Sequence, residues 1–285
     1  MDVYVGLDIG GTKFMAAAAD SRGKIIKRTR DETPHRLEEG VRLLKKMTKE
    51  VADGKKIISI GASIGGPLDW KAGIVSPLHQ PEWRNVSLKQ IFEAEFKCPF
   101  YVDVDTNVAA LGEWKARNCT SQRLLYLTIS TGMGGGFIVD GSIYRGMNGG
   151  HPEVAHQSVP WKGSFSEVVC ECGARGCLEE LVSGNGIRRL YGKPPEDLSE
   201  REWEEVAHNL GQGLRNLAAI YAPDVIAVGG GIAVGRNKLI NEAAGIMREN
   251  LKIVPVPKVE LSVLGYDTAL MGSIVLAIEG SRLGY

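Results

Sequence analysis

Three cysteines, Cys170, Cys172 and Cys177, lie close enough together in the sequence to bind one metal ion. Three thiolates at this spacing are typical of a zinc site, because a short loop can wrap around the ion where glycines supply its sharp turns. Gly173 and Gly176 stand where such turns are needed. Three free cysteines in a loop are the alternative, which the spacing disfavours. A tetrahedral site needs a fourth ligand from elsewhere in the chain.

The opening stretch has the residue types that bind a phosphate group together with a metal ion. An apolar run that contains Asp8 leads to Gly10-Gly11-Thr12-Lys13 and then to a second apolar run, which predicts two strands joined by a tight turn. Glycines let backbone N–H groups approach an anion, and Asp8 could hold a hydrated Mg²⁺ beside it. An ordinary hairpin turn is the alternative, and this stretch alone does not decide between the two. The order Thr12-Lys13 is not that of a P-loop, and a strand follows the turn, which disfavours a Rossmann site.

The same pattern returns about 125 residues later in the chain. Residues 124–130 predict a strand, a turn with Thr131, Gly132 and Gly134 follows, and residues 137–140 predict a second strand that also ends in an aspartate. Two copies of one unit indicate an internal duplication. We therefore expect two similar domains that face each other across a cleft, each aiming its glycine turn at the same anion.

The remaining periodicity predicts an α/β protein whose elements position these turns. Helices are expected at residues 35–53, 105–114, 178–190, 199–221, 236–250 and 269–278, and further strands at residues 24–28, 57–61, 100–104, 224–228 and 259–264. Residues 68–86 show little periodicity. Glycine-rich loops contain Gly65, Gly66, Gly229, Gly230 and Gly231.

Asp105 stands at the start of one predicted helix, in the sequence Asp105-Thr106-Asn107. Aspartate at a helix start is usually an N-cap. A structural role and a chemical role are therefore both open for this carboxylate.

The composition excludes several classes of function. The 285 residues carry 34 basic and 34 acidic side chains without a block of like charge, which indicates neither a nucleic-acid surface nor a membrane surface. No apolar stretch approaches the roughly 20 residues of a membrane-spanning helix. The N-terminus lacks the features of a signal peptide, so we expect a cytoplasmic protein.

Five motifs stand in a fixed order along the chain. They are Asp8-Ile9-Gly10-Gly11-Thr12-Lys13, Asp105-Thr106-Asn107, Ser130-Thr131-Gly132-Met133-Gly134-Gly135-Gly136, His151-Pro152-Glu153-Val154-Ala155-His156, and the block from Cys170 to Glu179. Together they resemble the ROK family of bacterial sugar kinases and related repressors, over essentially the whole chain. The resemblance implies an actin-like, ribonuclease-H-like fold with two domains and a central cleft.

The domain boundaries expected from this resemblance follow the duplicated hairpin. The first domain is expected at residues 1–112 together with 268–285. The second is expected at residues 113–267, with a zinc-stabilised insertion at residues 145–180.

The resemblance also implies roles for single residues. His156 falls where the zinc-binding histidine of the family lies, and it would close a structural Zn²⁺ site with the three cysteines. Asp105 would be the catalytic base that accepts the proton of a sugar hydroxyl, and Asp8 would position Mg²⁺.

The resemblance also implies which residues contact the two substrates. ATP would contact Gly10, Gly11, Thr12, Lys13, Thr131, Gly132, Gly134, Gly229, Gly230 and Gly231, although the last three glycines could instead form a packing turn. The sugar would contact Gly65, Gly66, His79, Val104, Asp105, Glu153, His156 and Glu179.

Val104 departs from the family pattern. Many family kinases carry an asparagine before the catalytic aspartate, where its amide binds sugar hydroxyls, and a valine cannot form that bond. Either the substrate differs at that hydroxyl or another group, such as His79, replaces the amide, which puts the affinity for plain glucose in question. The tripeptide His151-Pro152-Glu153 is more similar to the fructokinase-type members, and Ala155 replaces the usual glycine.

The function expected from these residues is that of an ATP-dependent kinase acting on a hydroxyl of a hexose or hexose-like polyol. The alternatives are a sugar-sensing protein without catalysis and an actin-like ATPase that needs no sugar. Family repressors carry a DNA-binding helix-turn-helix before the opening hairpin, which here begins at residue 3, and the zero net charge also disfavours DNA binding. Relatives in the family are often dimers, so a homodimer is expected.

Overall fold

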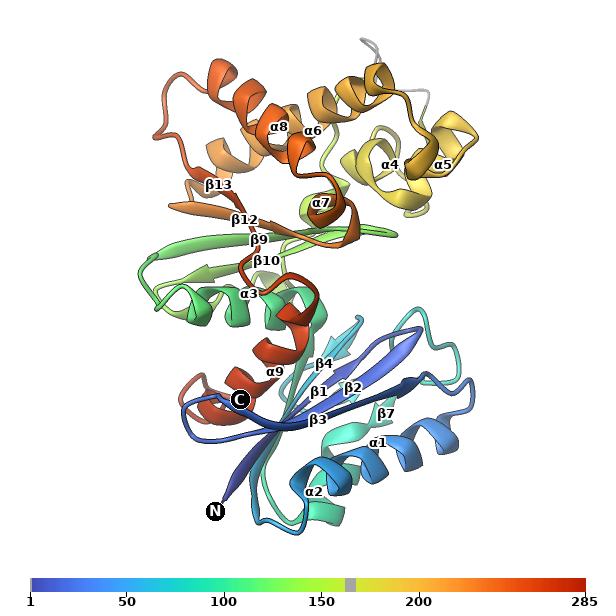
Figure 1. Ribbon diagram of the computed structural model, residues 1–285, viewed down its shortest axis with the longest axis vertical. Coiled ribbons are helices and arrows are strands. Elements are labelled where there is room, and N and C mark those ends of the chain that lie inside the picture. Colours follow the sequence, from blue (N-terminus) through green and yellow to red (C-terminus); the bar gives the residue numbers. More distant parts are fainter. Residues whose placement is uncertain (1, 162–167) are drawn as a thin grey trace. The chain divides into compact units, whose positions relative to one another are not determined.

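The computed structural model describes residues 2–161 and 168–285, and the chain divides into two compact units (Figure 1). The first unit is Met1–Ala116 together with Asp267–Tyr285, and the second is Arg117–Tyr266. Each unit contains one five-stranded sheet. Among the helices that the structure describes, none combines the length and the apolar character needed to cross a membrane.

The sheet of the first unit joins an antiparallel hairpin to two parallel strands. Its strands are β1 (Val3–Ile9), β2 (Lys13–Ala19), β3 (Ile25–Glu32), β4 (Ile57–Ile64) and β8 (Phe100–Val104). They lie in the order β3-β2-β1-β4-β8, with β1 antiparallel to β2 and parallel to β4, and with β4 parallel to β8. Because β1, β4 and β8 are parallel, their carboxyl ends meet at one edge of the sheet.

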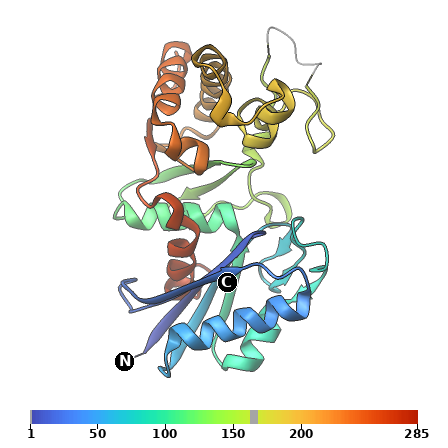
Figure 2. The same ribbon diagram turned by 45° about the vertical axis from the view of Figure 1, so that its right-hand side comes forward.

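Helices cover both faces of this sheet, which explains the nearly continuous apolar sequences of β1, β4 and β8. Helices α1 (Leu37–Ala52) and α2 (Leu88–Phe96) lie on one face, and α9 (Thr268–Glu279) lies on the other (Figures 1 and 2). Helix α9 comes so close to β4 that a Cβ at Gly61 would overlap the carbonyl of Ser273. Helix α3 (Asp105–Ala116) packs on α9 just as closely, since a Cβ at Gly272 would overlap the Val108 carbonyl. This tight packing fixes the helix that begins with Asp105.

The sheet of the second unit repeats the first. Its strands are β9 (Arg123–Ile129), β10 (Met133–Val139), β11 (Ser142–Ile143), β12 (Val225–Gly229) and β13 (Lys258–Leu261). Their order is β11-β10-β9-β12-β13, with β9 antiparallel to β10 and parallel to β12. Strand for strand this is the topology of the first sheet, so the predicted duplication is confirmed.

The helices of the second unit pack with its sheet around an apolar core. They are α4 (Leu178–Val182), α5 (Gly184–Tyr191), α6 (Glu200–Tyr221), α7 (Gly231–Gly235) and α8 (Asn237–Asn250), with short 3-10 turns η1 (Met147–Gly149), η2 (Val154–His156), η3 (Pro195–Asp197) and η4 (Gly265–Asp267). A serine followed three residues later by a glutamate predicts a capping box, and one begins α6. Ser199 Oγ accepts the Glu202 N–H, and the Glu202 carboxylate accepts the Ser199 N–H at 2.7 Å. Helices α6 and α8 pack against each other over the sheet.

Helix α2 and a small sheet were not among the predicted elements. Leu88, Ile91, Phe92 and Phe96 of α2 pack on the core at helical spacing, so the sequence carried a signal for this helix that the prediction missed. The stretch without periodicity contains a three-stranded antiparallel sheet of β5 (Leu68–Asp69), β6 (Ile74–Val75) and β7 (Val86–Ser87).

The prediction of one helix over residues 178–190 is wrong, because the chain breaks at Ser183. Its backbone is extended, with φ of −83° and ψ of 160°, and its Oγ accepts the Gly186 N–H at 3.1 Å. Ser183 therefore ends α4 and caps α5.

Candidate functional site

Two carboxylates lie near each other at the carboxyl edge of the first sheet. Asp8 is the next-to-last residue of β1, and Asp105 follows β8 as the first residue of α3. Strand pairing places Asp8 beside Ser63 of β4, and the Ser63 hydroxyl donates to Asp8 Oδ1 at 3.4 Å. Asp105 is exposed, and its Oδ1 accepts the Thr106 N–H at 2.7 Å. This carboxylate therefore bonds the backbone of the helix start and still faces solvent.

Burial and like charge both oppose the ionisation of Asp8. Burial has the largest effect on its pKa, the nearby Asp105 carboxylate raises it further, and Lys13 and the Ser63 hydroxyl lower it, which leaves a pKa of about 6. A cation is electrostatically favoured beside a desolvated carboxylate that is repelled by a neighbour. The charge and the setting of Asp8 therefore suit the Mg²⁺ position expected for it.

The first glycine turn joins β1 to β2. The Gly10 N–H donates to the Lys13 carbonyl at 3.1 Å, so Gly10 closes the turn. The Thr33 hydroxyl donates to the Gly10 carbonyl at 2.7 Å and holds the turn from the β3 side. Gly11, Thr12 and Lys13 are exposed, so this segment of the turn is open to an anion.

The glycine loop after β4 lies beside Val104. Gly65 and Gly66 follow the end of β4, and a Cβ at Gly66 would lie 3.7 Å from Val104 Cγ2. His79 lies at the first glycine turn instead, with its Cβ 3.2 Å from the position of a Cβ on Gly11. The structure thus brings Val104 together with Gly66, and His79 together with Gly11.

The second glycine turn joins β9 to β10 and is held by the start of α5. Within the turn, the Ser130 N–H donates to the Gly132 carbonyl at 2.8 Å. The carbonyls of Ser130 and Thr131 accept the N–H groups of Gly184 and Asn185 at 2.7 and 2.9 Å. Gly134, also expected to contact phosphate, belongs to strand β10.

The glycines at 229–231 pack against the end of β9. Gly230 has a φ of 91°, and a side chain there would overlap the backbone of Ile129. A Cβ at Gly229 would crowd the Tyr126 ring. A Cβ at Gly231 would lie 3.6 Å from Ser130 Oγ, which is ordinary contact. The packing therefore requires a glycine at positions 229 and 230. At position 231 the packing would also accept a side chain.

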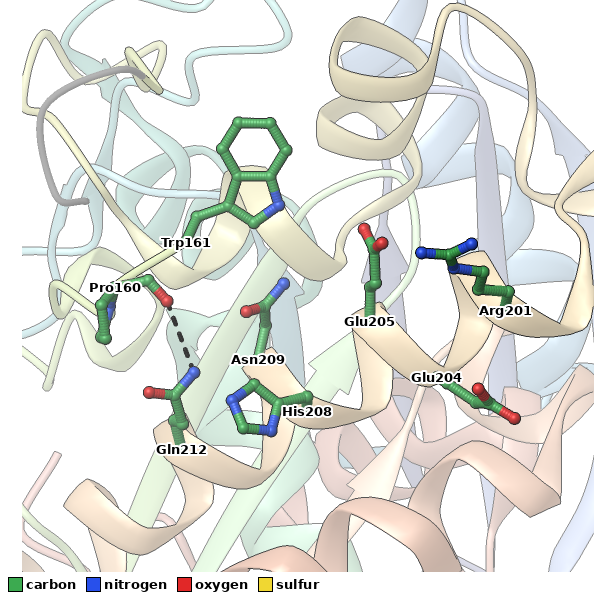
Figure 3. A pocket seen from close by; sticks show the side chains of 8 residues that line it. All are labelled: Pro160, Trp161, Arg201, Glu204, Glu205, His208, Asn209 and Gln212. Atoms are coloured by element: carbon green, nitrogen blue, oxygen red, sulfur yellow. Dashed lines mark hydrogen bonds between the residues drawn. The ribbon is translucent and has the colours of Figure 1, made fainter. Parts of the chain in front are cut away.

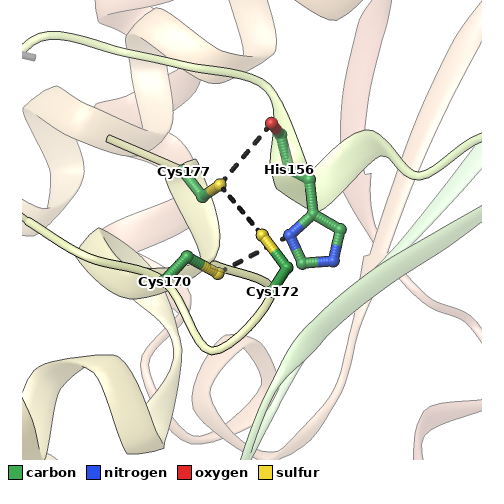
Figure 4. A group of neighbouring side chains, drawn as sticks. All are labelled: His156, Cys170, Cys172 and Cys177. Carbon is green, nitrogen blue, oxygen red and sulfur yellow. Dashed lines mark hydrogen bonds between the residues drawn. The ribbon is translucent and has the colours of Figure 1, made fainter. Parts of the chain in front are cut away.

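Cys170, Cys172, Cys177 and His156 converge on one point (Figure 4). Their ligand atoms all lie within 4.8 Å of one another. Cys172 Sγ lies 3.7 Å from Cys177 Sγ, and Cys170 Sγ lies 3.7 Å from His156 Nδ1. A tetrahedral zinc ion, with bonds of about 2.3 Å to sulfur and about 2.0 Å to nitrogen, separates its ligand atoms by roughly 3.5–3.8 Å. Two of the distances, both 3.7 Å, match that geometry, and no two ligand atoms are more than 4.8 Å apart, so the four side chains are placed to close around one zinc ion. The sulfurs of Cys172 and Cys177 are too far apart for a disulfide.

A tight hairpin presents the three cysteines. The Cys170 N–H donates to the Ala174 carbonyl at 2.8 Å, and Gly173 and Gly176 have positive φ angles of 88° and 73°. Glycine adopts such angles without strain, so both of the sharp turns predicted here are confirmed. A hydrogen bond from the Ala174 backbone lowers the pKa of the Cys172 thiol, which favours the thiolate that binds metal ions.

Glu179 connects this cluster to the second glycine turn. Its Oε1 accepts the Met133 N–H at 3.0 Å, and its Oε2 lies 3.7 Å from His156 Nδ1 and 3.9 Å from Cys170 Sγ. On the other side of the imidazole, His156 Nε2 lies 3.9 Å from a carboxylate oxygen of Glu153. The imidazole therefore presents Nδ1 to the cysteines and Nε2 to Glu153. Glu153, His156 and Glu179, the three side chains of this unit that are expected to bind sugar, therefore lie next to one another.

Sequence reasoning missed Ser63 and a buried network beneath Asp105. Asp103 is almost fully buried, and its carboxylate accepts hydrogen bonds from Asn107 Nδ2 at 3.1 Å and from the Tyr285 hydroxyl. These bonds hold the junction of β8 and α3, where Asp105 sits. Asn107 belongs to the Asp-Thr-Asn motif, which could have indicated it, whereas Tyr285 is 182 residues from Asp103 and leaves no local signal.

We expect one zinc ion per chain at the cysteine cluster. Cys177→Ser removes a thiolate and should abolish stoichiometric zinc and lower the melting temperature, because metal binding contributes directly to the folding of such a loop. Elemental analysis and calorimetry measure the two effects. Cys119→Ser is the matched control, since Cys119 is exposed and is not one of the clustered residues. Full zinc content with an unchanged melting temperature in Cys177→Ser would contradict the assignment.

Asp8→Asn should stabilise the protein at neutral pH. The folded-state pKa of about 6 lies above the reference value of 3.8, so the folded state binds more protons between these values and its stability falls as the pH rises through them. Above pH 6 the substitution should raise the free energy of unfolding by up to about 3 kcal/mol, and below pH 4 by little. Urea unfolding between pH 4 and pH 8, in magnesium-free buffer, measures the difference.

Asp20→Asn is a control that should change the free energy of unfolding in the opposite direction. The backbone N–H groups of Lys24 and Arg22 lower the pKa of Asp20, so its carboxylate stabilises the fold at neutral pH and that contribution is lost as the pH falls. This variant should therefore be less stable than the wild type at pH 7. An Asp8→Asn gain of equal size at pH 4 and pH 8 would rule out a raised pKa at Asp8.

Known proteins with the same sequence pattern and fold place the chain in a family. A model of the ROK family matches residues 4–280. The fructokinase of Zymomonas mobilis is 31% identical, over 98% of this chain and 98% of that protein. The ROK hexokinase of Thermus thermophilus superimposes with a TM-score of 0.86 at 28% identity, over 99% of this chain and 100% of that chain. The ROK glucokinase of Streptomyces griseus, in complex with glucose and AMPPNP, has a TM-score of 0.80 at 25% identity, over 98% of this chain and 100% of that chain.

These matches extend over nearly the full length of the chain, and they confirm the expected actin-like, ribonuclease-H-like fold. The glycine turns, the Asp105 helix start and the cysteine cluster all lie within the matched residues. The chain therefore belongs to the ROK family.

Proposed function

We propose that this chain is an ATP-dependent sugar kinase that transfers the γ-phosphoryl group of ATP to a hydroxyl of a hexose or hexose-like sugar. The observation that carries the proposal is the exposed Asp105 carboxylate beside the desolvated Asp8 carboxylate, at the sheet edge next to a glycine turn. The names of the related fructokinase and of the glucokinase bound to glucose and AMPPNP support the same reaction class.

Asp105 acts as the base, late in the reaction. Phosphoryl transfer needs charge neutralisation, in-line positioning and an acceptor for the hydroxyl proton. An aspartate carboxylate is a far weaker base than the alkoxide that it would have to generate, so it cannot deprotonate a free alcohol beforehand. Asp105 therefore orients the hydroxyl and takes its proton as the new oxygen–phosphorus bond forms and the bond to the ADP oxygen breaks.

The two glycine turns are the phosphate-binding segments in this proposal. In the first unit the exposed Gly11-Thr12-Lys13 segment supplies donors and a positive charge. In the second unit Thr131 and Gly132 supply the corresponding turn. Asp8 holds Mg²⁺, which when bound neutralises phosphate charge, and above a pH of about 6 this carboxylate is ionised and can do so.

Glu153, His156 and Glu179 bind the sugar hydroxyls in this proposal. Carboxylate oxygens suit a polyol because each can accept from more than one hydroxyl. A zinc ion on His156 Nδ1 would leave the imidazole proton on Nε2, the nitrogen that faces Glu153 at 3.9 Å. The cysteine cluster thereby gives His156 a fixed orientation and makes Nε2 a hydrogen-bond donor.

Asp105→Asn should lower kcat by about 10²–10⁴-fold while the sugar KM changes little, because the amide keeps a polar contact and loses the proton acceptor. A coupled ADP assay with a panel of hexoses and polyols measures this, and ADP release should require a sugar. Asp197→Asn is the control, since this exposed carboxylate lies outside the proposed site. Sugar binding without ADP release would indicate a non-catalytic sensor, and sugar-independent hydrolysis that survives Asp105→Ala would indicate an ATPase.

Val104→Asn should shift the sugar preference toward glucose. The substitution places an amide beside Gly66 and next to Asp105, where a hydrogen bond to a sugar hydroxyl should raise kcat/KM for glucose by roughly three- to tenfold. The ratio of kcat/KM for glucose and fructose is the measurement. Val104→Ala, which removes the methyl groups without adding a hydrogen bond, is the matched control. An equal ratio in the asparagine and alanine variants would exclude Val104 as a determinant of specificity.

A further inference from the structure

A pocket of about 570 Å³ opens along one side of α6 in the second unit (Figure 3). Its volume lies within the range of about 300–1,000 Å³ that is common for small-molecule sites. Trp161 forms one side, and a bond from Gln212 Nε2 to the Pro160 carbonyl at 3.4 Å ties the Trp161 segment to α6. No residue assigned above to phosphate, sugar or zinc lines this pocket.

Asn209 is the residue that indicates a ligand. Its side chain is 3% exposed, lines the pocket, and leaves Nδ2 without a hydrogen-bond partner among the described residues. A buried amide donor without a partner costs free energy, so its retention needs a reason. In Figure 3 the amide lies between Trp161 and Glu205. An oxygen atom of a ligand in the pocket would satisfy this donor.

The residues around Asn209 supply both donors and acceptors. Arg201, Glu205 and Asn209 are four residues apart on α6, so they lie along one face of the helix. Glu205 Oε2 accepts the Tyr191 hydroxyl at 3.3 Å, and a carboxylate can accept several hydrogen bonds. Arg201 offers further donors, and the Trp161 ring offers a flat apolar surface. An apolar ring beside hydrogen-bond donors and acceptors is complementary to a ligand that has apolar faces and hydroxyl groups around its edge.

The charges select among ligand classes. Among the described residues that line the pocket, Glu204 and Glu205 would repel an anion, and Arg201 is the one permanently charged cation. A cation would be attracted by the two carboxylates, but an ammonium or guanidinium group has no acceptor for the Asn209 amide and would be repelled by Arg201. Hydroxyl groups can donate to Glu205 and accept from Asn209 without either conflict.

We propose that this pocket binds a neutral saccharide of one or two rings, stacked on Trp161 and hydrogen-bonded to Asn209 and Glu205, as a second carbohydrate site. The site is distinct from the proposed site of phosphoryl transfer. Its existence does not depend on the kinase reaction, since none of its residues takes part in that proposal.

Binding can be tested by the fluorine NMR signal of a labelled Trp161 side chain. The chain has five tryptophans, so 5-fluorotryptophan labelling gives few fluorine signals, and Trp161→Phe identifies the one that belongs to Trp161. Glucose, fructose and maltose are titrated separately, with L-arginine and inorganic phosphate as cationic and anionic probes. The Trp161 signal should shift in a saturable way with at least one of the three sugars and with neither charged probe.

Two leucine variants distinguish a ligand-binding role for Asn209 from a structural one. Asn209→Leu should weaken sugar binding by roughly three- to tenfold. It should also raise the melting temperature, because it removes a buried donor without a partner. Asn216→Leu, on the same helix and outside the pocket, should leave the Kd unchanged.

Several outcomes would overturn the proposal. Absence of a shift with all three sugars would do so, as would a shift with arginine or phosphate alone. A sugar-induced shift that persists unchanged in Asn209→Leu would come from binding elsewhere. A lower melting temperature of Asn209→Leu with unchanged binding would make Asn209 structural. A Trp161 shift that follows protein concentration would mean that a second copy of the chain covers the pocket.

Discussion

The charge of Asp8 is the constraint on which the first unit depends. Parallel strands bring their carboxyl ends to one edge, so the fold itself places Asp8 and Asp105 near each other. The burial that stabilises β1 also removes water from Asp8, and Lys13 and Ser63 offset only part of this cost. A bound cation would relieve the repulsion that opposes folding of the free protein. Stability without ligand and affinity for a cation are therefore opposed effects of one carboxylate.

Glu179 has a comparable position in the second unit. One of its oxygens bonds the glycine turn through Met133, and the other faces His156 and Cys170 in the cysteine cluster. The glycine turn on one side and the cysteine cluster on the other thus fix the position of the Glu179 carboxylate. A metal ion held by the cluster would act on the turn through Glu179, without touching a phosphate itself, which is the usual way in which groups around a metal ion transmit its effect.

Features that depend on neighbours in the sequence could be predicted, and features that depend on distant contacts could not. The hairpins, the cap of α6 and the cysteine loop each form within a short stretch, and their predictions agree with the structure. The break at Ser183 is an exception, because Ser183-Gly184-Asn185-Gly186 combines a capping serine with two glycines, a local signal that the prediction overlooked. The bond from Ser63 to Asp8 follows from strand register, and Tyr285 reaches Asp103 across 182 residues. Such contacts leave no periodic signal in the sequence.

The two sheets share one strand order, yet the chain between the third and fourth strands of each repeat differs greatly. In the first unit this crossover is residues 33–56 and holds α1, whereas in the second it is residues 144–224 and holds the cysteine cluster and α4 to α6. The sheet tolerates the longer crossover because only its two ends must meet fixed strands. If the proposed sugar-binding residues are correct, replacing this one crossover would change which sugar the protein binds and leave the strand order of both sheets as it is.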